Sequence, residues 1–229
     1  MIERRSTLPR TQFVTAAVVA LLLASALASV LLWQTIQQRD HVLDVGRLRL
    51  QRQATELAEH ASRTLEAVDL SLATALAYRD PDHAPADWYD RLRRTLLFLP
   101  QVHNLQVFAA DGRLEYDARR MAPPPQNVAS ESFFAAHREQ RIEFLLDQPV
   151  HMGGRWMVPM SRRMEGHDNA FAGVLRALVD VSYFSDFYSL GDSGEAGQVL
   201  LFDNNGAVLV NWSPRQPSGG VGGSVDALL

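Results

Sequence analysis

The feature that most constrains this chain is an uncharged apolar run near its start, residues 13–33. Its 21 residues, at a helical rise of about 1.5 Å each, match the roughly 30 Å hydrocarbon core of a membrane. Trp33 stands where an interfacial aromatic side chain would lie, and arginines precede the run at Arg4, Arg5 and Arg10. The run predicts a single transmembrane helix, with residues 1–12 in the cytoplasm.

A cleaved signal peptide is the alternative interpretation of the same run. The tripeptide Ala26-Leu27-Ala28 has the small-x-small pattern of a cleavage site. The apolar run continues beyond that site to Trp33, which favours an uncleaved anchor. In both interpretations the rest of the chain is exported, and an anchor would make the protein a single-pass protein of the inner membrane with a periplasmic or extracellular domain.

Composition excludes several classes of function. A net charge of −4 and a pI near 6.0 offer no basic face for nucleic acid. The chain has no cysteine, so disulfides, thiolate metal sites and thiol nucleophiles are ruled out. No metal-binding motif, phosphate-binding loop or serine-nucleophile motif occurs. We therefore expect neither an enzyme, nor a cofactor, nor a metal site.

Residues 34–78 are predicted to form one long stalk helix. They contain no proline, and Gly46 is the only helix-breaking residue. Apolar residues recur at spacings of three, four or seven, at Leu43, Leu50, Ala54, Leu57, Ala61, Leu65, Val68, Leu72 and Leu76. This apolar face either packs on its own domain or pairs with a second chain as a short coiled coil, and a membrane stalk favours the homodimer.

Residues 79–212 are predicted to form one α+β domain around a central antiparallel sheet with flanking short helices. Turn residues and hydrophobic periodicity give a helix at 86–99, a hairpin at 105–116, helices at 130–139 and 181–190, strands at 143–150, 155–162 and 171–179, and a last hairpin joining 198–202 to 207–210. The helix at 130–139 is expected to start at Ser130 or Ser132. The Ser-, Pro- and Gly-rich segment 213–229 is expected to be flexible coil and incomplete.

Five short segments together resemble a known family. They are Phe133-Phe134-Ala135-Ala136-His137-Arg138, residues 156–163, Phe171-Ala172-Gly173-Val174, Val179-Asp180-Val181-Ser182-Tyr183-Phe184 and Gly194-Glu195-Ala196-Gly197. They follow the hairpin with Asp111-Gly112, which is a further point of match. In this order they resemble the Cache, or PDC, sensor domains found outside the membrane in bacterial diguanylate cyclases, histidine kinases and chemoreceptors. The resemblance implies a PAS-like fold and a small-ligand sensor for signal transduction.

The chain departs from that family pattern in two places. Similar proteins often carry an arginine just before the aromatic pair, where this chain has Glu131-Ser132. They also continue into a second membrane span and a cytoplasmic output domain. We therefore expect this chain to be truncated before those parts.

A predicted strand supplies the first two candidate ligand-binding residues, Trp156 and Arg162. Period-two geometry puts them on one face, although Pro159 between them suggests an edge strand or a bulge. An aromatic wall beside a guanidinium suits a small carboxylate. The alternative is that Trp156 belongs to the core and that Arg162 is a surface or salt-bridging residue.

The other candidates follow the same reasoning. The resemblance implies that Asp180 takes an amine, so that Asp180 opposite Arg162 would suit an amino acid; the alternative is that Asp180 caps a helix starting near Ser182. Phe134, His137 and Tyr183 are further candidates for the ligand site. The alternative for His137 is a hydrogen-bonded core or rim residue, and the alternative for Tyr183 is a core residue. We expect a membrane-anchored small-ligand sensor, and the competing hypothesis is an anchored structural or protein-interaction module.

Overall fold

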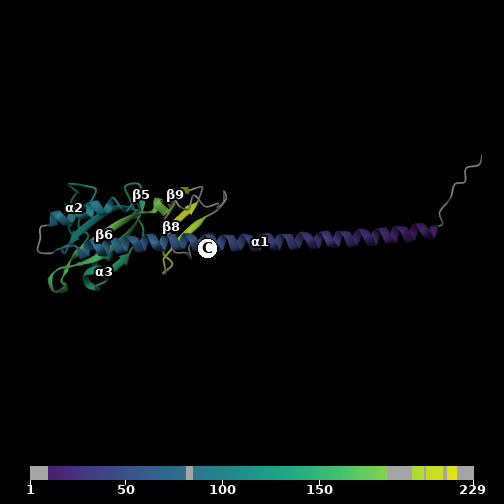
Figure 1. Ribbon diagram of the computed structural model, residues 1–229, viewed down its shortest axis with the longest axis horizontal. Helices are drawn as coiled ribbons and strands as arrows, with labels where there is room; N and C mark the ends of the chain where they lie inside the picture. The colour runs from purple at the N-terminus through teal and green to yellow at the C-terminus, as the bar shows by residue number, and fades with distance from the viewer. Residues whose placement is uncertain (1–9, 81–84, 185–197, 204, 214–215, 221–229) are drawn as a thin grey trace, which may run out of the picture. The chain divides into compact units, whose positions relative to one another are not determined.

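The computed structural model describes residues 10–80, 85–184, 198–203, 205–213 and 216–220, and only the backbone of 10–17, 35–44 and 216–220. The chain divides into two compact units, Met1–Thr55 and Glu56–Leu229, and each is described by itself. Figure 1 labels the main helices and strands.

Helix α1, Arg10–Ala77, confirms the long helix predicted for residues 34–78 and extends it back through the apolar run. Gly46 does not interrupt it, as its cost of about 1 kcal/mol relative to alanine led us to expect. Apolar side chains of the first unit are exposed, among them Leu21 at 73% and Leu50 at 62%. No helix among the described residues combines the length and the hydropathy needed to cross a membrane. The transmembrane helix at 13–33 stays a prediction.

Within Glu56–Leu229, the last turns of α1 pack against the domain's own sheet. Ala61, Val68 and Leu72 are at most 1% exposed and belong to the main hydrophobic core. Helix α2, Pro85–Leu96, covers the same side and ends three residues before the predicted 99. The indole Nε1 of Trp88 donates to the carbonyl of Ala75 at 2.8 Å and fixes α2 on α1.

The main sheet is antiparallel and has six strands, in the order β2-β1-β6-β5-β3, with β4 also paired to β5. The strands are β1 Val102–Ala109, β2 Leu114–Asp117, β3 Phe144–Leu146, β4 Val150–Met152, β5 Arg155–Glu165 and β6 Phe171–Asp180. A 3₁₀ turn, His167–Asn169, joins β5 to β6. The predicted hairpin at 105–116 is confirmed, and the strand expected at 143–150 is divided into β3 and β4.

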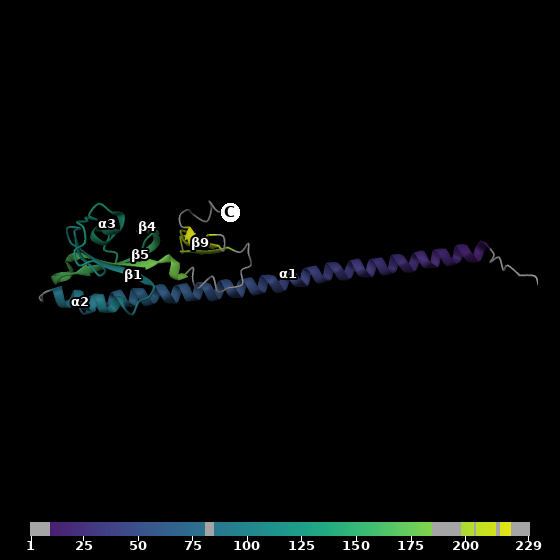
Figure 2. The same ribbon diagram turned by 90° about the horizontal axis from the view of Figure 1, so that it is seen from above.

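Helices lie on both sides of this sheet. Figure 2 shows α1 and α2 against one side and α3, Ser132–Glu139, on the other. Helix α3 confirms the prediction for 130–139, but its N-cap residue is Glu131, and no side chain caps it. The helix therefore begins at Ser132, one of the two predicted start residues, but no serine side chain caps it.

Pro159 lies inside β5, between β6 and the edge strands, and produces no bulge there. The pairing of β5 with β6 runs without a shift from Met157 to Met164. The carbonyl of Pro159 accepts from the N–H of Asp147, so the nitrogen of Pro159 faces that same edge. β3 ends at Leu146, so the missing donor falls in the gap between β3 and β4. Neither of the two positions that the sequence suggested for Pro159, an edge strand or a bulge, is observed.

The predicted last hairpin is confirmed as β7, Val199–Phe202, and β8, Val208–Ser213. It belongs to a second, three-stranded sheet instead of the one central sheet that we expected. The third strand is β9, Gln216–Gly220, in the segment predicted to be coil. Residues 216–220 form a strand because they pair with β8. The local composition of a segment does not reveal such a partner strand. Of the short helix predicted at 181–190, residues 181–184 are helical and the remainder lies outside the described residues.

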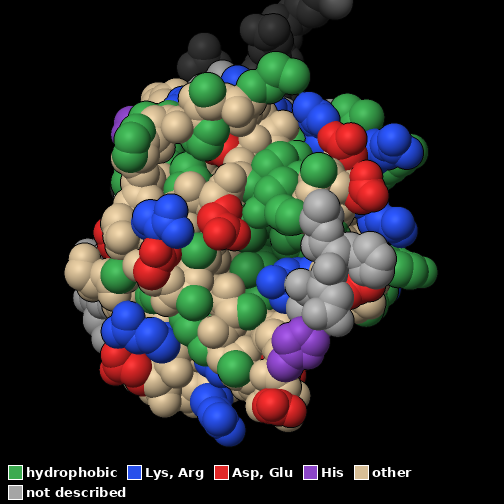
Figure 3. Space-filling model, turned by 90° about the vertical axis from the view of Figure 1, so that its left-hand side faces the viewer, with side chains coloured by type: hydrophobic (Ala, Val, Ile, Leu, Met, Phe, Trp, Pro, Cys, Tyr) green, Lys and Arg blue, Asp and Glu red, His purple; other side chains and the backbone are tan. Residues whose placement is uncertain are grey.

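Some apolar side chains of the second unit stay in solvent. The end turned to the viewer in Figure 3 shows apolar side chains among charged ones. Leu97 and Phe98, just after α2, are 78% and 82% exposed. Exposed apolar residues of this kind are ordinary on protein surfaces and define no site by themselves.

Candidate functional site

The sheet separates the six candidate residues into two groups. Side chains alternate along β5 and β6, so one face packs on α1 and α2 and the other on α3. Trp156, Arg162 and Tyr183 lie on the α1 side. Asp180, His137 and Phe134 lie on the α3 side. Arg162 and Asp180 are therefore on opposite faces, and the hypothesis that they hold one zwitterion together is wrong.

Arg162 is bound to helix α1. Its Nε and Nη2 donate to the two carboxylate oxygens of Asp69 at 2.6 and 2.8 Å. The two side chains are only 22% and 28% exposed, and the hydrogen bond to Asp69 raises the pKa of Arg162. This bidentate pair matches the salt-bridge alternative for Arg162. It links the central strand β5 to the long helix.

Trp156 and Tyr183 pack on the edge of the main core. Both are partly buried against it. The ring of Tyr183 stacks on His60 of α1 with centroids 6.2 Å apart, and Trp156 meets His151 edge-on at 5.1 Å. The core alternative describes both residues well.

Asp180 ends β6 and is 8% exposed. One carboxylate oxygen accepts from the N–H and the hydroxyl of Ser182 at 2.9 and 2.7 Å, and the other accepts from Nη1 of Arg155 at 2.8 Å. Burial raises the pKa of Asp180, but the bonds from Ser182 and Arg155 outweigh burial and lower it below the usual value. Asp180 thus caps the helical turn, as the alternative expected, and carries a negative charge on the α3 side.

Phe134 and His137 hold α3 on the sheet. Both are fully buried. The two ring nitrogens of His137 lie 2.6 Å from the carbonyl of Ile142 and 2.8 Å from the hydroxyl of Ser161 on β5. Burial lowers the pKa of His137 and favours the neutral ring. The ring of Phe134 meets Phe171 edge-on at 5.3 Å. Both are core residues.

Sequence reasoning missed a polar cluster on the α3 face, made of Asn104, Gln106, Asp117 and Arg176. All four are at most 8% exposed. Asn104 and Gln106 donate to one oxygen of Asp117 at 2.9 and 3.2 Å, and Arg176 donates to Gln106 at 2.7 Å. The buried Oδ1 of Asn104 has no partner among the described residues.

Two sequence signals could have revealed this cluster. Asn104 and Gln106 alternate with apolar residues along β1, and Arg176 interrupts an otherwise apolar β6. Both patterns put polar groups on a face that is buried. Such groups need partners, and only strand pairing supplies them.

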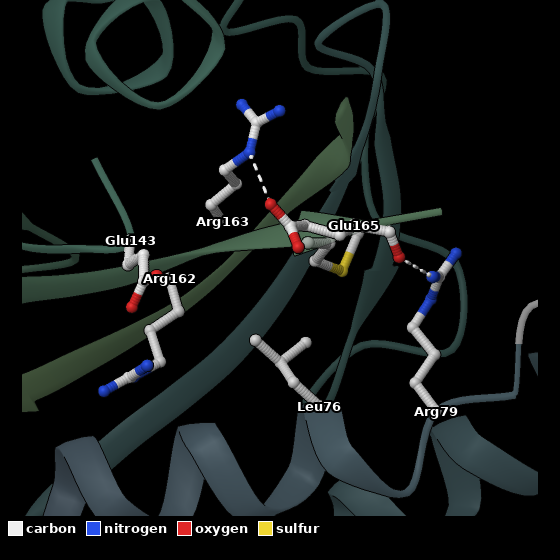
Figure 4. Close-up of a pocket in the computed structure, with 7 residues that line it drawn as sticks. Leu76, Arg79, Glu143, Arg162, Arg163 and Glu165 are labelled. Atoms are coloured by element: carbon white, nitrogen blue, oxygen red, sulfur yellow. Dashed lines mark hydrogen bonds and ion pairs between the residues drawn. The ribbon is translucent and has the colours of Figure 1, made fainter. Parts of the chain in front are cut away.

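A small pocket of about 220 Å³ opens where the end of α1 meets the end of β5. Figure 4 shows Leu76 pointing from α1 toward the sheet, and Arg162 and Arg163 pointing to opposite sides of β5. Arg79 donates to the carbonyl of Glu165 at 3.1 Å. The lining residues are Leu76, Arg79, Glu143, Arg162, Arg163, Met164 and Glu165. Three arginines and two glutamates are among them, so the lining carries one excess positive charge.

No three His, Asp or Glu side chains of the described ranges are placed to hold a metal ion. The chemistry available on the α3 face is instead that of recognition: a buried guanidinium, a capped carboxylate, amides and aromatic rings.

Comparison with known proteins identifies this arrangement. No protein-family model and no curated protein matches the chain. The extracellular domain of a candidate histidine kinase is 31% identical over 73% of this chain and 70% of its own, with a TM-score of 0.65.

Two chemoreceptor domains share the fold at lower identity. The ligand-binding domain of the Pseudomonas fluorescens chemoreceptor CtaA, in complex with L-alanine, is 14% identical over 78% of this chain and 76% of its own, with a TM-score of 0.60. The domain of the Pseudomonas aeruginosa amino acid chemoreceptor PctC, in complex with GABA, is 14% identical over 76% of each chain, with a TM-score of 0.55. The identity to the histidine kinase domain, the layered α+β fold and the ordered motifs agree, and the chain belongs to the Cache, or PDC-type, family of extracellular sensor domains carried by histidine kinases and chemoreceptors.

Proposed function

We propose that this sensor domain binds a small amino acid or carboxylate on the α3 face of its main sheet and passes the change to helix α1. The polar cluster on that face carries the proposal, because its buried charged and amide groups are of the kind that orient a small ligand. The two chemoreceptor domains of the same fold are in complex with L-alanine and GABA. We also propose that the chain has no enzymatic activity.

Strand β5 connects the two faces. Ser161 touches His137 on the α3 side, and the adjacent Arg162 is bound to Asp69 of α1 on the other side. A ligand that favours one position of β5 would therefore favour one position of α1. Such a shift requires different ligand affinities for the two arrangements.

A thermal-shift screen tests ligand binding. The full chain in detergent micelles is heated with single amino acids, small carboxylates or polyamines. A true ligand at about 100 times its Kd adds about 2.7 kcal/mol, which is a rise of about 5–10 °C for a domain of this size. Asp180→Asn should reduce the shift by ligands with an amine, whereas Asp168→Asn, at an exposed turn, should not. If no class of compound stabilises the chain, the result would favour the competing hypothesis of an anchored structural or protein-interaction module.

We further propose that residues 13–33 anchor the chain in the inner membrane and that α1 pairs two copies. Supporting observations are the 21 uncharged residues and the exposure of Val45, Leu48 and Leu50. The chain has no cysteine, so Leu50→Cys introduces a single one. After oxidation of intact cells, we expect a disulfide-linked dimer in the membrane fraction. Glu56→Cys is the matched control, because Glu56 follows the exposed apolar residues Val45, Leu48 and Leu50 along the helix. Recovery in the soluble fraction would refute the anchor, and equal cross-linking of both variants would refute the pairing.

A further inference from the structure

Arg176 is a buried cation without a buried anion beside it. It lies in the middle of β6 and is 8% exposed. Its Nε and Nη2 both donate to one neutral oxygen, Oε1 of Gln106, at 3.2 and 2.7 Å. No described carboxylate is within ion-pair distance of it. Burial lowers its pKa to about 10. Buried charges are normally paired. An anion that pairs with this guanidinium would have to come from outside the described residues.

The cluster's own carboxylate is already engaged. Asp117 accepts from the amides of Asn104 and Gln106 and from the backbone N–H groups of Arg119 and Arg120. Gln106 is thus fixed at both ends, with its NH₂ on Asp117 and its oxygen on Arg176. A guanidinium has five N–H donors, and Gln106 engages only two of them. The others can serve a ligand.

The surroundings of Arg176 restrict what such a ligand can be. The rings of Phe108 and Phe133 lie 4.8 and 4.9 Å from the guanidinium carbon. The guanidinium therefore lies over two aromatic rings, which offer it no hydrogen-bond acceptor of their own. Glu131 and Asp147 are close enough to raise the pKa of Arg176, though neither forms an ion pair with it. A second negative charge on the ligand would be repelled by them, whereas an ammonium group would be attracted.

We infer that Arg176 receives the carboxylate of the ligand, and that the site selects zwitterionic amino acids over dicarboxylates. The inference rests on the proposed ligand-binding function and names the anion receptor of that site. It places the receptor on strand β6, and not on Arg162.

Calorimetric titration of the full chain in detergent micelles tests the inference. The probes are L-alanine, L-isoleucine and GABA, with L-alaninamide, which lacks the carboxylate, and succinate, which has two. We expect the wild-type chain to bind at least one of the three amino acids and to bind alaninamide and succinate at least tenfold more weakly. Arg176→Gln should weaken amino acid binding by about 100-fold, because charged hydrogen bonds are lost.

Further variants keep the test independent of folding. Arg176→Lys retains the charge without the planar fork and should fall between the wild type and Arg176→Gln. Arg138→Gln, an exposed arginine of α3, is the matched control and should bind like the wild type. Circular dichroism verifies folding, and Arg176→Gln should be no less stable, because an unpaired buried charge is removed.

The outcomes separate the inference from the proposed function. Unchanged amino acid binding by folded Arg176→Gln or Arg176→Lys overturns the inference, as does a wild-type chain that prefers succinate, alaninamide or a polyamine. The proposed function survives unchanged binding by the variants and a preference for succinate, whereas a preference for alaninamide or a polyamine overturns it as well. Failure of the wild type to bind any compound overturns the proposed function and the inference with it.

Discussion

Gly173→Ala is expected to cost at least about 3 kcal/mol of folding free energy and to leave little folded sensor domain. Gly173 lies in β6 with φ +134°, which side-chain-bearing residues rarely adopt. An added Cβ would lie 2.0 Å from the carbonyl oxygen of Phe108 on β1 and 2.9 Å from Cε of Met164. Met164 can move, but the oxygen belongs to a paired strand. Urea denaturation followed by circular dichroism measures the loss.

Gly154→Ala is the matched control for this prediction. Gly154 also has positive φ, +79°, but its added Cβ meets nothing within 4 Å. Gly154→Ala should therefore cost only about 1 kcal/mol of folding free energy, from backbone strain alone. Equal stability of the two variants would show that the close approach of β1 and β6 at Gly173 does not constrain the fold.

The Asp69–Arg162 pair gives the second large effect. We expect Asp69→Asn and Arg162→Met each to cost about 2 kcal/mol, between the values for exposed and fully buried pairs, because both side chains are mostly buried. Each single change leaves one charge without its partner. The double variant should therefore lose less than the sum of the two, and a double-mutant cycle by urea denaturation measures the difference.

The pair Glu59–Arg63 on the same helix is the control. Its side chains are 60% and 78% exposed, so Glu59→Gln should change stability by less than about 0.5 kcal/mol. Additive effects at Asp69 and Arg162 would refute the coupling.

The same variants distinguish structure from ligand binding. Arg162 lies on the α1 face, so Arg162→Met should keep the ligand affinity of the wild type while uncoupling the sheet from α1. Loss of affinity would restore Arg162 as a ligand-binding residue. An Arg162→Ala chain that retained all signalling would refute the coupling of the sheet to α1 through Asp69 and Arg162.

The elements of the fold were largely predictable from the sequence. Helix α1 follows from residues spaced by three, four and seven, and the hairpin of β1 and β2 from the turn at Asp111-Gly112, because both depend on neighbours in the chain. β9 was not predictable, since its partner β8 gives it the structure that its composition does not.

The site was less predictable than the fold. The alternation along β5 correctly placed Trp156 and Arg162 on one face, but it could not assign that face to α1 or α3. Arg176 was overlooked because an arginine in an apolar strand signals a buried polar group but does not identify its partner, Gln106, on another strand. Pro159 was misjudged because its effect depends on where β3 ends.

The sequence by itself determined the long helix and the change from helical to sheet periodicity, because backbone geometry imposes these patterns on neighbouring residues. It also contained the family motifs, because each motif is a short continuous segment. The tertiary structure alone decided which charges meet. Arg162 and Asp69 are 93 residues apart, and Arg176 and Gln106 are 70 apart. Only the registry of strands and the packing of α1 bring such groups within hydrogen-bonding distance. Because of that registry we propose Arg176, and not Arg162, as the carboxylate receptor.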